Sequence, residues 1–223
     1  MPLVEIRAWS LGAFETNCYV VTTRPQAGAP RDPACWIVDP GEDPAEVIEF
    51  IRQERLQPAA ILLTHAHADH IAGLREVRAA FPGVPTLLHR AEWDFLDDPQ
   101  LNLSAFVGMP LSLAPAEGEL SDGQTLDLNG ARWRVLHTPG HSPGGVTLVC
   151  DAAGQAIVGD TLFAGSIGRT DFPTSDPAAM ARSLLGTLLS LPDAVRVHPG
   201  HGPSTTIGAE RRSNPFLQGA RAG

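Results

Sequence analysis

The stretch Thr64-His65-Ala66-His67-Ala68-Asp69-His70 places four side chains of metal-ligand type within six residues. It follows a continuous apolar run, residues 59–63, which is typical of a buried strand, and it precedes apolar residues at helical spacing. Because side chains alternate along an extended backbone, His65 and His67 should point to the same side. Imidazole nitrogens and carboxylate oxygens suit Zn(II), Fe(II) or Mn(II). The spacing therefore predicts a metal site at the end of a strand. The alternatives are a surface cluster of histidines and an aspartate that only caps a helix.

Three further residues of ligand type occur in a shared context later in the chain. His141, Asp160 and His201 each follow a glycine directly, and each comes soon after a predicted apolar strand. Any one of them alone would more often be structural. Their common position at strand ends, beside the first cluster, favours one site built from distant parts of the chain.

The apolar pattern predicts an alternation of strands and helices. Strands are predicted at residues 3–9, 17–22, 35–39, 59–63, 86–89, 124–128, 132–137, 146–150, 155–158 and 194–197. Helices are predicted from Asp43-Pro44, from about Asp69, over residues 91–96, from Asp176-Pro177 to about Leu191, and over residues 209–212. Two β-rich halves that each carry helices favour two packed sheets with helices on both outer faces.

Two connecting segments are longer than a tight turn. Residues 23–33, rich in Pro, Gly and Ala, separate two apolar runs and are interpreted as a long hairpin loop. Residues 97–115 are predicted to be irregular, and they flank the site as a lid or pack as a satellite of the core.

Composition narrows the class of protein. The chain has 223 residues, 43% of them hydrophobic, which is enough for one domain with a core and excludes a disordered chain. The net charge of −9, without a basic run, argues against a nucleic-acid partner. The absence of a long apolar run argues against a membrane span, and the N-terminal residues do not resemble a secretory signal. Three widely spaced cysteines fit a reducing, cytoplasmic location. All 16 basic residues are Arg.

The motifs together resemble the metallo-β-lactamase superfamily and, within it, the short glyoxalase II-like hydrolases. The matching segments, in the family's order, are His65-Ala66-His67-Ala68-Asp69-His70, Thr138-Pro139-Gly140-His141, Gly159-Asp160-Thr161-Leu162-Phe163, Gly168-Arg169-Thr170-Asp171-Phe172-Pro173, Pro199-Gly200-His201-Gly202-Pro203 and Glu210-Arg211-Arg212-Ser213-Asn214-Pro215. The resemblance covers nearly the whole chain. It implies an α/β fold, a four-layer αββα sandwich, with the site at one edge of the sheets.

The resemblance also implies two divalent metal ions, with Zn expected first and Fe or Mn as alternatives. The first ion would be held by His65, His67 and His141, the second by Asp69, His70 and His201, and Asp160 would bridge them. The expected enzyme is a dinuclear metallohydrolase of the hydroxyacylglutathione hydrolase type. A metal-bridging hydroxide, held with Asp69 and Asp160, would attack a small-molecule thioester such as S-lactoylglutathione.

Substrate recognition is the part of the family pattern that this chain departs from. Full-length glyoxalase II enzymes carry a C-terminal helical domain, and we expect a single domain over residues 1–223 without it. The family also uses Lys and Tyr around the thiol conjugate, whereas this chain has no Lys and a single tyrosine, Tyr19. We therefore expect Arg211 and Arg212 to bind substrate carboxylates.

Other functions remain open at this stage. Persulfide dioxygenases resemble the chain too, and the corresponding single iron would be held by His65, His141 and Asp160. A lactonase or β-lactamase shares the fold, and a non-catalytic metal-binding module is the remaining alternative. Arg169 and Asp171 are interpreted as a structural ion pair. The histidines His89, His137 and His198 are interpreted as structural, and the cysteines as core residues. The sequence does not indicate an oligomeric state.

Overall fold

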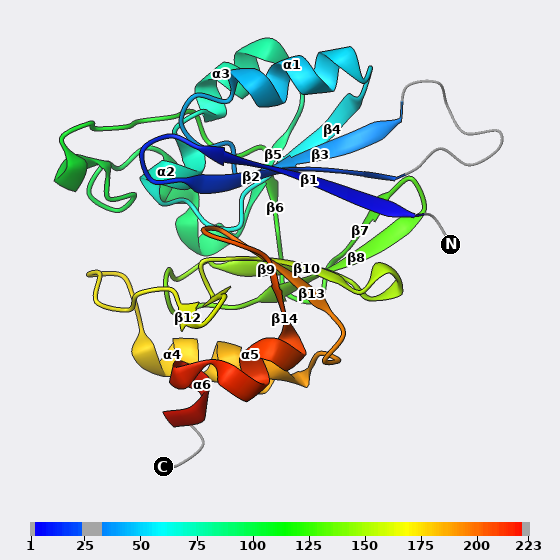
Figure 1. Ribbon diagram of the computed structural model, residues 1–223. Helices are drawn as coiled ribbons and strands as arrows, with labels where there is room; N and C mark the ends of the chain where they lie inside the picture. The colour runs from blue at the N-terminus through cyan, green and yellow to red at the C-terminus, as the bar shows by residue number, and fades with distance from the viewer. Residues whose placement is uncertain (1–2, 24–32, 220–223) are drawn as a thin grey trace.

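Two six-stranded sheets form the centre of the molecule (Figure 1). The computed structural model describes residues 3–23 and 33–219. The first sheet has the order β1 (Val4–Leu11), β2 (Thr16–Thr23), β3 (Ala34–Val38), β4 (Gln57–Leu62), β5 (Thr86–Leu88) and β6 (Gly118–Glu119). The second has the order β14 (Thr205–Thr206), β13 (Arg196–Pro199), β10 (Gln155–Gly159), β9 (Val146–Cys150), β8 (Ala131–His137) and β7 (Thr125–Leu128). A separate ribbon joins β11 (Leu162–Phe163) to β12 (Ser166–Ile167).

Helices cover the outer faces of both sheets (Figure 1). The helices are α1 (Ala45–Gln53), α2 (Ala68–Ile71), α3 (Leu74–Ala80), α4 (Pro177–Arg182), α5 (Ile207–Ser213) and α6 (Pro215–Gly219). α1 and α3 lie on the first sheet, and α4, α5 and α6 lie on the second. The remaining helical turns are η1 (Arg90–Leu96), η2 (Ser104–Val107), η3 (Asp151–Ala153), η4 (Ser183–Thr187) and η5 (Leu188–Ser190). The predicted αββα sandwich is therefore confirmed.

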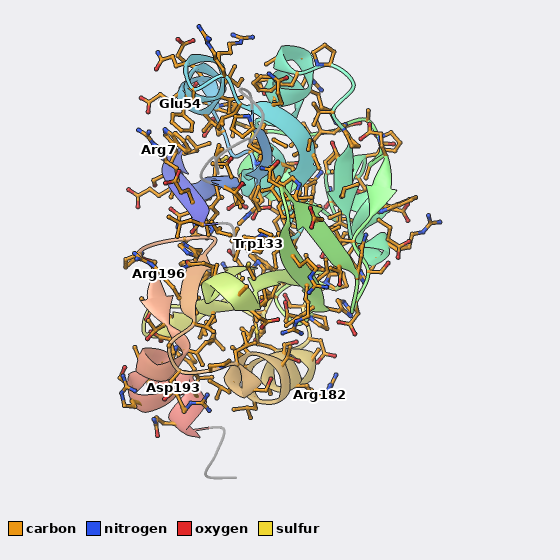
Figure 2. The ribbon with its side chains drawn as sticks, turned by 90° about the vertical axis from the view of Figure 1, so that its right-hand side faces the viewer. Arg7, Glu54, Trp133, Arg182, Asp193 and Arg196 are labelled. Carbon is orange, nitrogen blue, oxygen red and sulfur yellow. The ribbon has the colours of Figure 1, made fainter. Side chains whose placement is uncertain are left out.

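The strand β3 shows how alternation builds the layers. Cys35 and Ile37 belong to the core under α1 and α3, whereas Trp36 and Val38 belong to the core between the sheets. Trp133 from β8 is fully buried in the same inter-sheet core, with its ring centroid 6.0 Å from that of Trp36 (Figure 2). One strand thus supplies apolar side chains to two cores, which is why its apolar run is continuous.

The helix predicted from about Asp69 is in fact two helices, α2 and α3, separated at Ala72 and Gly73. A Cβ at Gly73 would overlap the carbonyl oxygen of Gly41 and the ring of Pro44. The loop before α1 therefore passes too close for any other residue here, and the chain changes direction at this point. The prediction of one uninterrupted helix was wrong because this contact is long-range.

Two predicted helix starts had different outcomes. At Asp176-Pro177 the prediction is confirmed, because the Asp176 carboxylate accepts hydrogen bonds from the backbone N–H groups of Ala178 and Ala179. At Asp43-Pro44 it was wrong: Pro44 is the N-cap, no side chain caps the helix, and Asp43 has a φ of +57°.

Most other elements lie near the predicted positions, with small shifts. The last long strand is β13, which begins and ends two residues later than predicted. The short elements β6, β11, β12, β14 and α6 were not predicted, because they are too short to show a period. The predicted hairpin loop at residues 23–33 falls almost wholly outside the described residues. Among the described residues, no helix has the length and apolar character needed to cross a bilayer.

Candidate metal centre

The candidate ligands lie where strands of both sheets end. His65, His67, Asp69 and His70 follow β4 in the first sheet. In the second sheet β8 and β10 both pair antiparallel with β9, and β13 runs parallel to β10, so all three end at the same edge. The loops after these three strands carry His141, Asp160 and His201 in turn. The topology therefore explains why residues so distant in sequence meet.

The structure brings all seven predicted ligands together in three overlapping groups of three residues. Within each group the candidate ligand atoms lie within 4.8 Å of one another. The first group is His65, His67 and His141, and the second is Asp69, His70 and His201. A third group, His65, His70 and Asp160, shares one residue with each of them.

Asp160 lies between the two groups. Its Oδ2 is 3.4 Å from His141 Nε2 and 3.5 Å from His201 Nε2, and its Oδ1 is 3.4 Å from His70 Nε2. A Cβ at Gly200 would overlap both Asp160 Oδ1 and the ring of His70. Glycine directly before His201 is thus required by the close approach of the two loops.

The orientation of three imidazoles is fixed by hydrogen bonds at Nδ1. His141 Nδ1 donates to the carbonyl of Arg169 at 2.9 Å, and His201 Nδ1 donates to the carbonyl of Phe14 at 3.0 Å. His70 Nδ1 lies 3.0 Å from the carboxylate of Asp39. Because a carbonyl only accepts, Nδ1 carries the proton in the first two rings, and Nε2 is the atom that these rings can offer to a cation.

Several polar atoms at the site are buried and lack a hydrogen-bond partner. They are His65 Nε2, His67 Nε2, His70 Nε2 and Asp160 Oδ1. Leaving a buried polar atom unpaired costs about 1–3 kcal/mol, so several at one place need an explanation. Divalent cations would supply partners for His65 Nε2, His70 Nε2 and Asp160 Oδ1, and the His and Asp donors suit Zn, Fe or Mn. His67 faces His141 Nε2 through its Nδ1, at 2.9 Å. The described residues therefore fit a metal centre.

Charge is distributed unevenly over the site. Burial, together with the neighbouring histidines, lowers the pKa of His65 well below its ordinary value. Burial also opposes the charged forms of His70 and His201, but the nearby carboxylates outweigh it: the pKa of His70 is raised well above its ordinary value and that of His201 to about 10. Burial alone would raise the pKa of Asp69 and Asp160, yet the His70 charge and a hydrogen bond from His201 lower both. A cation at this end would therefore displace protons from His70 and His201.

Contacts from outside the predicted set hold the ligand loops. The buried Glu92 carboxylate accepts from the N–H of Ala66 at 2.5 Å through Oε2 and from the N–H of Gly144 at 2.7 Å through Oε1. It thereby joins the loop of His65 and His67 to the loop of His141. Sequence reasoning missed Glu92, because a carboxylate in a short predicted helix carries no signal that it is buried.

Strand β2 makes a second set of supporting contacts, to the loop of His201 and to Asp69. Asn17 Nδ2 donates to the carbonyls of Pro199 and Gly202, and the Tyr19 hydroxyl donates to Pro199 at 2.6 Å. Thr16 Oγ1 donates to Asp69 Oδ2 at 2.9 Å. The strand pair at the edge of the first sheet therefore positions a ligand loop of the second sheet.

A cavity of about 780 Å³ borders the metal centre. Residues from the β1–β2 turn, the segment 97–115 and the β11–β12 ribbon also line it. The lining residues include the ligand residues His67, Asp69, His141, Asp160 and His201. A molecule of substrate size can thus reach both groups of ligands.

The predicted substrate arginines lie elsewhere. Arg211 Nε donates to Asp193 Oδ1 at 2.8 Å, and Arg212 lies 3.9 Å from the same carboxylate. Figure 2 shows Asp193 beside the C-terminal helices, and neither arginine lines the cavity. Arg169, interpreted from the sequence as structural, does line it and also pairs with Asp171 at 2.6 Å.

The other residues interpreted as structural have structural contacts. His89 and His137 stack at 4.1 Å, and His198 Nε2 lies 2.7 Å from Gln155 Oε1. All three cysteines are buried and free.

The sandwich and its cluster of buried histidines and aspartates define a metal-binding α/β protein. Residues 11–201 match the family model of the metallo-beta-lactamase superfamily, and the chain belongs to this superfamily. It is 37% identical to the "Probable metallo-hydrolase YqgX" of Bacillus subtilis, over 96% of this chain and 97% of the relative. It is 34% identical to the "Hydroxyacylglutathione hydrolase GloC" of Haemophilus influenzae, over 92% and 94%.

Solved structures show the same fold. The BLEG-1 B3 metallo-beta-lactamase superposes with a TM-score of 0.88 and 40% identity, over 96% of this chain and 99% of that one. TTHA1623 in a di-iron-bound form superposes with a TM-score of 0.81 and 38% identity, over 95% and 100%. ETHE1 from Myxococcus xanthus superposes with a TM-score of 0.77 over 96% and 85%, and at 21% identity this likeness shows the fold alone. By family the chain is a metallo-hydrolase.

Proposed function

We propose that the protein is a dinuclear hydrolase that cleaves thioesters of low-molecular-weight thiols, such as S-lactoylglutathione. The observation that carries the proposal is the arrangement of two adjoining ligand groups around Asp160, beside a cavity of substrate size. The likeness to a protein named hydroxyacylglutathione hydrolase supports the thioester class. The likeness to a di-iron-bound protein supports two ions.

The ligand sets follow from the two groups. His65, His67 and His141 would hold one cation, and Asp69, His70 and His201 would hold the other, with Asp160 shared. When bound, divalent cations would lower the pKa of a water molecule and stabilise negative charge on the carbonyl oxygen and the leaving thiolate. Zn is the first candidate, and Fe and Mn suit the same donors.

The protein's own residues fix the ligands and set the charge. Hydrogen bonds at Nδ1 direct the Nε2 atoms of His141 and His201 toward ligation, and the two carboxylates, Asp69 and Asp160, stay ionised. Two divalent cations offset by these two carboxylates would leave a net charge of about +2. The centre would therefore favour a reaction that develops negative charge.

A single-iron dioxygenase is the alternative that uses only His65, His141 and Asp160. Such a site would leave the second group without a purpose, yet His70 is held by Asp39 and His201 by the Phe14 carbonyl. Hydrogen bonds thus hold ligands in both groups. This favours the hydrolase, because only the hydrolase would use both groups.

Lactam hydrolysis is a second candidate, because the protein shares 40% identity with a B3 metallo-beta-lactamase over nearly its whole length. A β-lactam substrate, assayed beside the thioester, separates the two activities.

Metal analysis combined with substrate assays tests the proposal. The purified protein should hold about two metal ions per chain and hydrolyse S-lactoylglutathione. Asp160→Asn should lose metal and activity together, whereas Asp193→Asn, a change at an exposed carboxylate, should keep both. One iron per chain with oxygen uptake on glutathione persulfide, and no thioester turnover, would instead establish the dioxygenase.

A further inference from the structure

The wall of the cavity beyond the candidate ligands is mostly apolar. Its apolar members come from the β1–β2 turn, the segment 97–115, the β11–β12 ribbon and the loop after that ribbon. They are Phe14, Leu103, Phe106, Val107, Phe163, Ile167, Phe172 and Pro173. Phe14 and Phe106 leave 51% and 66% of their surface exposed, which is unusual for phenylalanine. Four separate segments thus place apolar side chains around one opening.

The cavity offers little to a charged substrate. Apart from the candidate ligands, the one charged side chain among its lining residues is Arg169. Its Nε and Nη2 donate to Asp171 Oδ1 and Oδ2 at 2.6 and 2.7 Å, Nη1 is not part of this pair, and its guanidinium lies 4.3 Å from the centroid of Phe172. A thiol conjugate that carries several carboxylates would find no second cation among the lining residues.

The segment 97–115 presents its part of the wall in a fixed conformation. Asn102 is fully buried, and its Nδ2 donates to the carbonyls of Phe95 and Leu111. The backbone carbonyl of Asn102 accepts a hydrogen bond from the N–H of Ala68, which lies within the candidate ligand cluster. Ser104 accepts from the N–H of Leu111. These bonds tie the segment to the metal centre.

The backbone conformation of Leu103 is a second indication that this wall binds a ligand. Its φ of +69° lies in the left-handed region, which is costly for a branched side chain, and its side chain lines the cavity. Such strain persists where the surrounding structure imposes it, often at ligand sites. The neighbouring Asn102 and Ser104 hydrogen bonds supply that constraint.

We propose that this wall binds an apolar acyl arm, so that the preferred substrates are thioesters of hydrocarbon acids and not of short hydroxy acids. The inference rests on the proposed thioester hydrolysis and specifies its substrate. The acyl carbon would lie at the metal centre, and the hydrocarbon arm would extend along Phe106, Val107 and their neighbours. Burial of each added methylene favours binding by roughly fourfold at full burial.

The experiment compares acyl arms on one uncharged thiol. Metal-quantified protein is assayed with the acetyl, butyryl, hexanoyl and octanoyl thioesters of N-acetylcysteamine, and with S-lactoylglutathione. We expect kcat/KM to rise roughly two- to fourfold per methylene over part of the series. A flat or falling series, with S-lactoylglutathione the best substrate, would overturn the inference and leave the proposed function standing.

Two variants locate the effect. Phe106→Ser should flatten the dependence on chain length, while Phe216→Ser, the same change at an exposed phenylalanine of α6 outside the cavity lining, should preserve it. An unchanged slope in Phe106→Ser would remove this wall from acyl recognition.

A binding measurement separates the two hypotheses if no thioester is cleaved. Calorimetric titration of metal-loaded protein with octanoate and with lactate needs no turnover. Octanoate binding at least tenfold tighter, and weakened by Phe106→Ser, would support the apolar arm even if thioester hydrolysis itself failed. Equal affinities would contradict it.

Discussion

Glu92 is a single side chain that connects two ligand loops. Its two oxygens accept from the N–H groups of Ala66 and Gly144, and the residue is fully buried. Because both oxygens act as acceptors, the carboxylate cannot be replaced by an amide without loss. In Glu92→Gln the amide nitrogen would face one backbone N–H, and both donors would compete for a single oxygen.

We therefore expect Glu92→Gln to lower the free energy of unfolding by about 1–3 kcal/mol. Urea denaturation of metal-free protein measures the effect. Glu54→Gln is the matched control, since Glu54 is exposed at the end of α1 (Figure 2). Equal midpoints for the two variants would show that the hydrogen bonds of the Glu92 carboxylate to Ala66 and Gly144 contribute nothing to stability.

His198 predicts a pH dependence of stability. Burial, and to a lesser degree the charge of Arg196, lowers its pKa to about 4, while its Nε2 contacts Gln155. The folded-state pKa lies below the ordinary value of 6.5, so the unfolded chain binds the proton first as the pH falls. The contribution of neutral His198 to the free energy of unfolding is therefore complete above pH 6.5, and it is lost as the pH falls from 6.5 to 4.

The variant His198→Asn keeps a side-chain amide donor but cannot titrate in this range. It should therefore remove this part of the pH dependence of the free energy of unfolding. Between pH 7 and pH 5 the wild type should lose about 2 kcal/mol more than the variant. The comparison is made by urea unfolding in chelator, so that the metal centre is equally empty in both proteins. A loss of the same size in both proteins would mean that His198 titrates normally in the fold.

At the scale of elements, the break between α2 and α3 depends on Gly73. A side chain there would overlap Gly41 and Pro44, whose loop leads into α1. Gly73→Ala should therefore destabilise the fold by about 1–3 kcal/mol, despite the higher helix propensity of Ala. Gly186→Ala is the control, because an added Cβ meets nothing there and φ is not positive. The two variants should differ in melting temperature, and equal values would mean that the α1 loop moves aside at little cost.

Local pattern was sufficient to predict those elements whose signal lies within a few residues. The run at residues 59–63 and the cap at Asp176 depend on their own side chains, and both predictions hold. The start of α1 and the α2–α3 break depend on contacts between segments, which no window of sequence contains. The same reason explains why Glu92 was missed: its role exists only after two ligand loops approach it.

The convergence of the candidate ligands could be predicted because they lie in segments that follow strand ends and because they match the motifs of one superfamily. The residues that recognise the substrate could not be predicted, because they depend on which segments border the cavity after folding. Arg211 and Arg212 are conspicuous in sequence but bind Asp193, whereas Phe14 and Phe106 are ordinary in sequence and line the cavity.

At the scale of the whole molecule, the candidate ligands come from both sheets. One part of the ligand set follows β4 of the first sheet, and the other follows β8, β10 and β13 of the second. Bound cations would therefore act as a cross-link between the halves of the sandwich, in addition to their chemical role. Within the second group, Asp69 lies 3.4 Å from His70 Nε2 and 3.1 Å from His201 Nε2, so these side chains also attract one another directly.

Metal removal should consequently lower the stability of the whole molecule and not only its activity. A ligand that binds only the folded state stabilises it by about 4 kcal/mol at a thousandfold excess over its dissociation constant. We expect chelation to lower the melting temperature by several degrees and restored Zn to recover it. Asp160→Asn should already melt near the chelated wild type and respond little to Zn, because the shared ligand is lost. If chelation left the wild-type transition unchanged while removing the metal, the cations would not couple the two sheets, and the strand-edge contacts of Asn17 and Tyr19 would be sufficient to hold them.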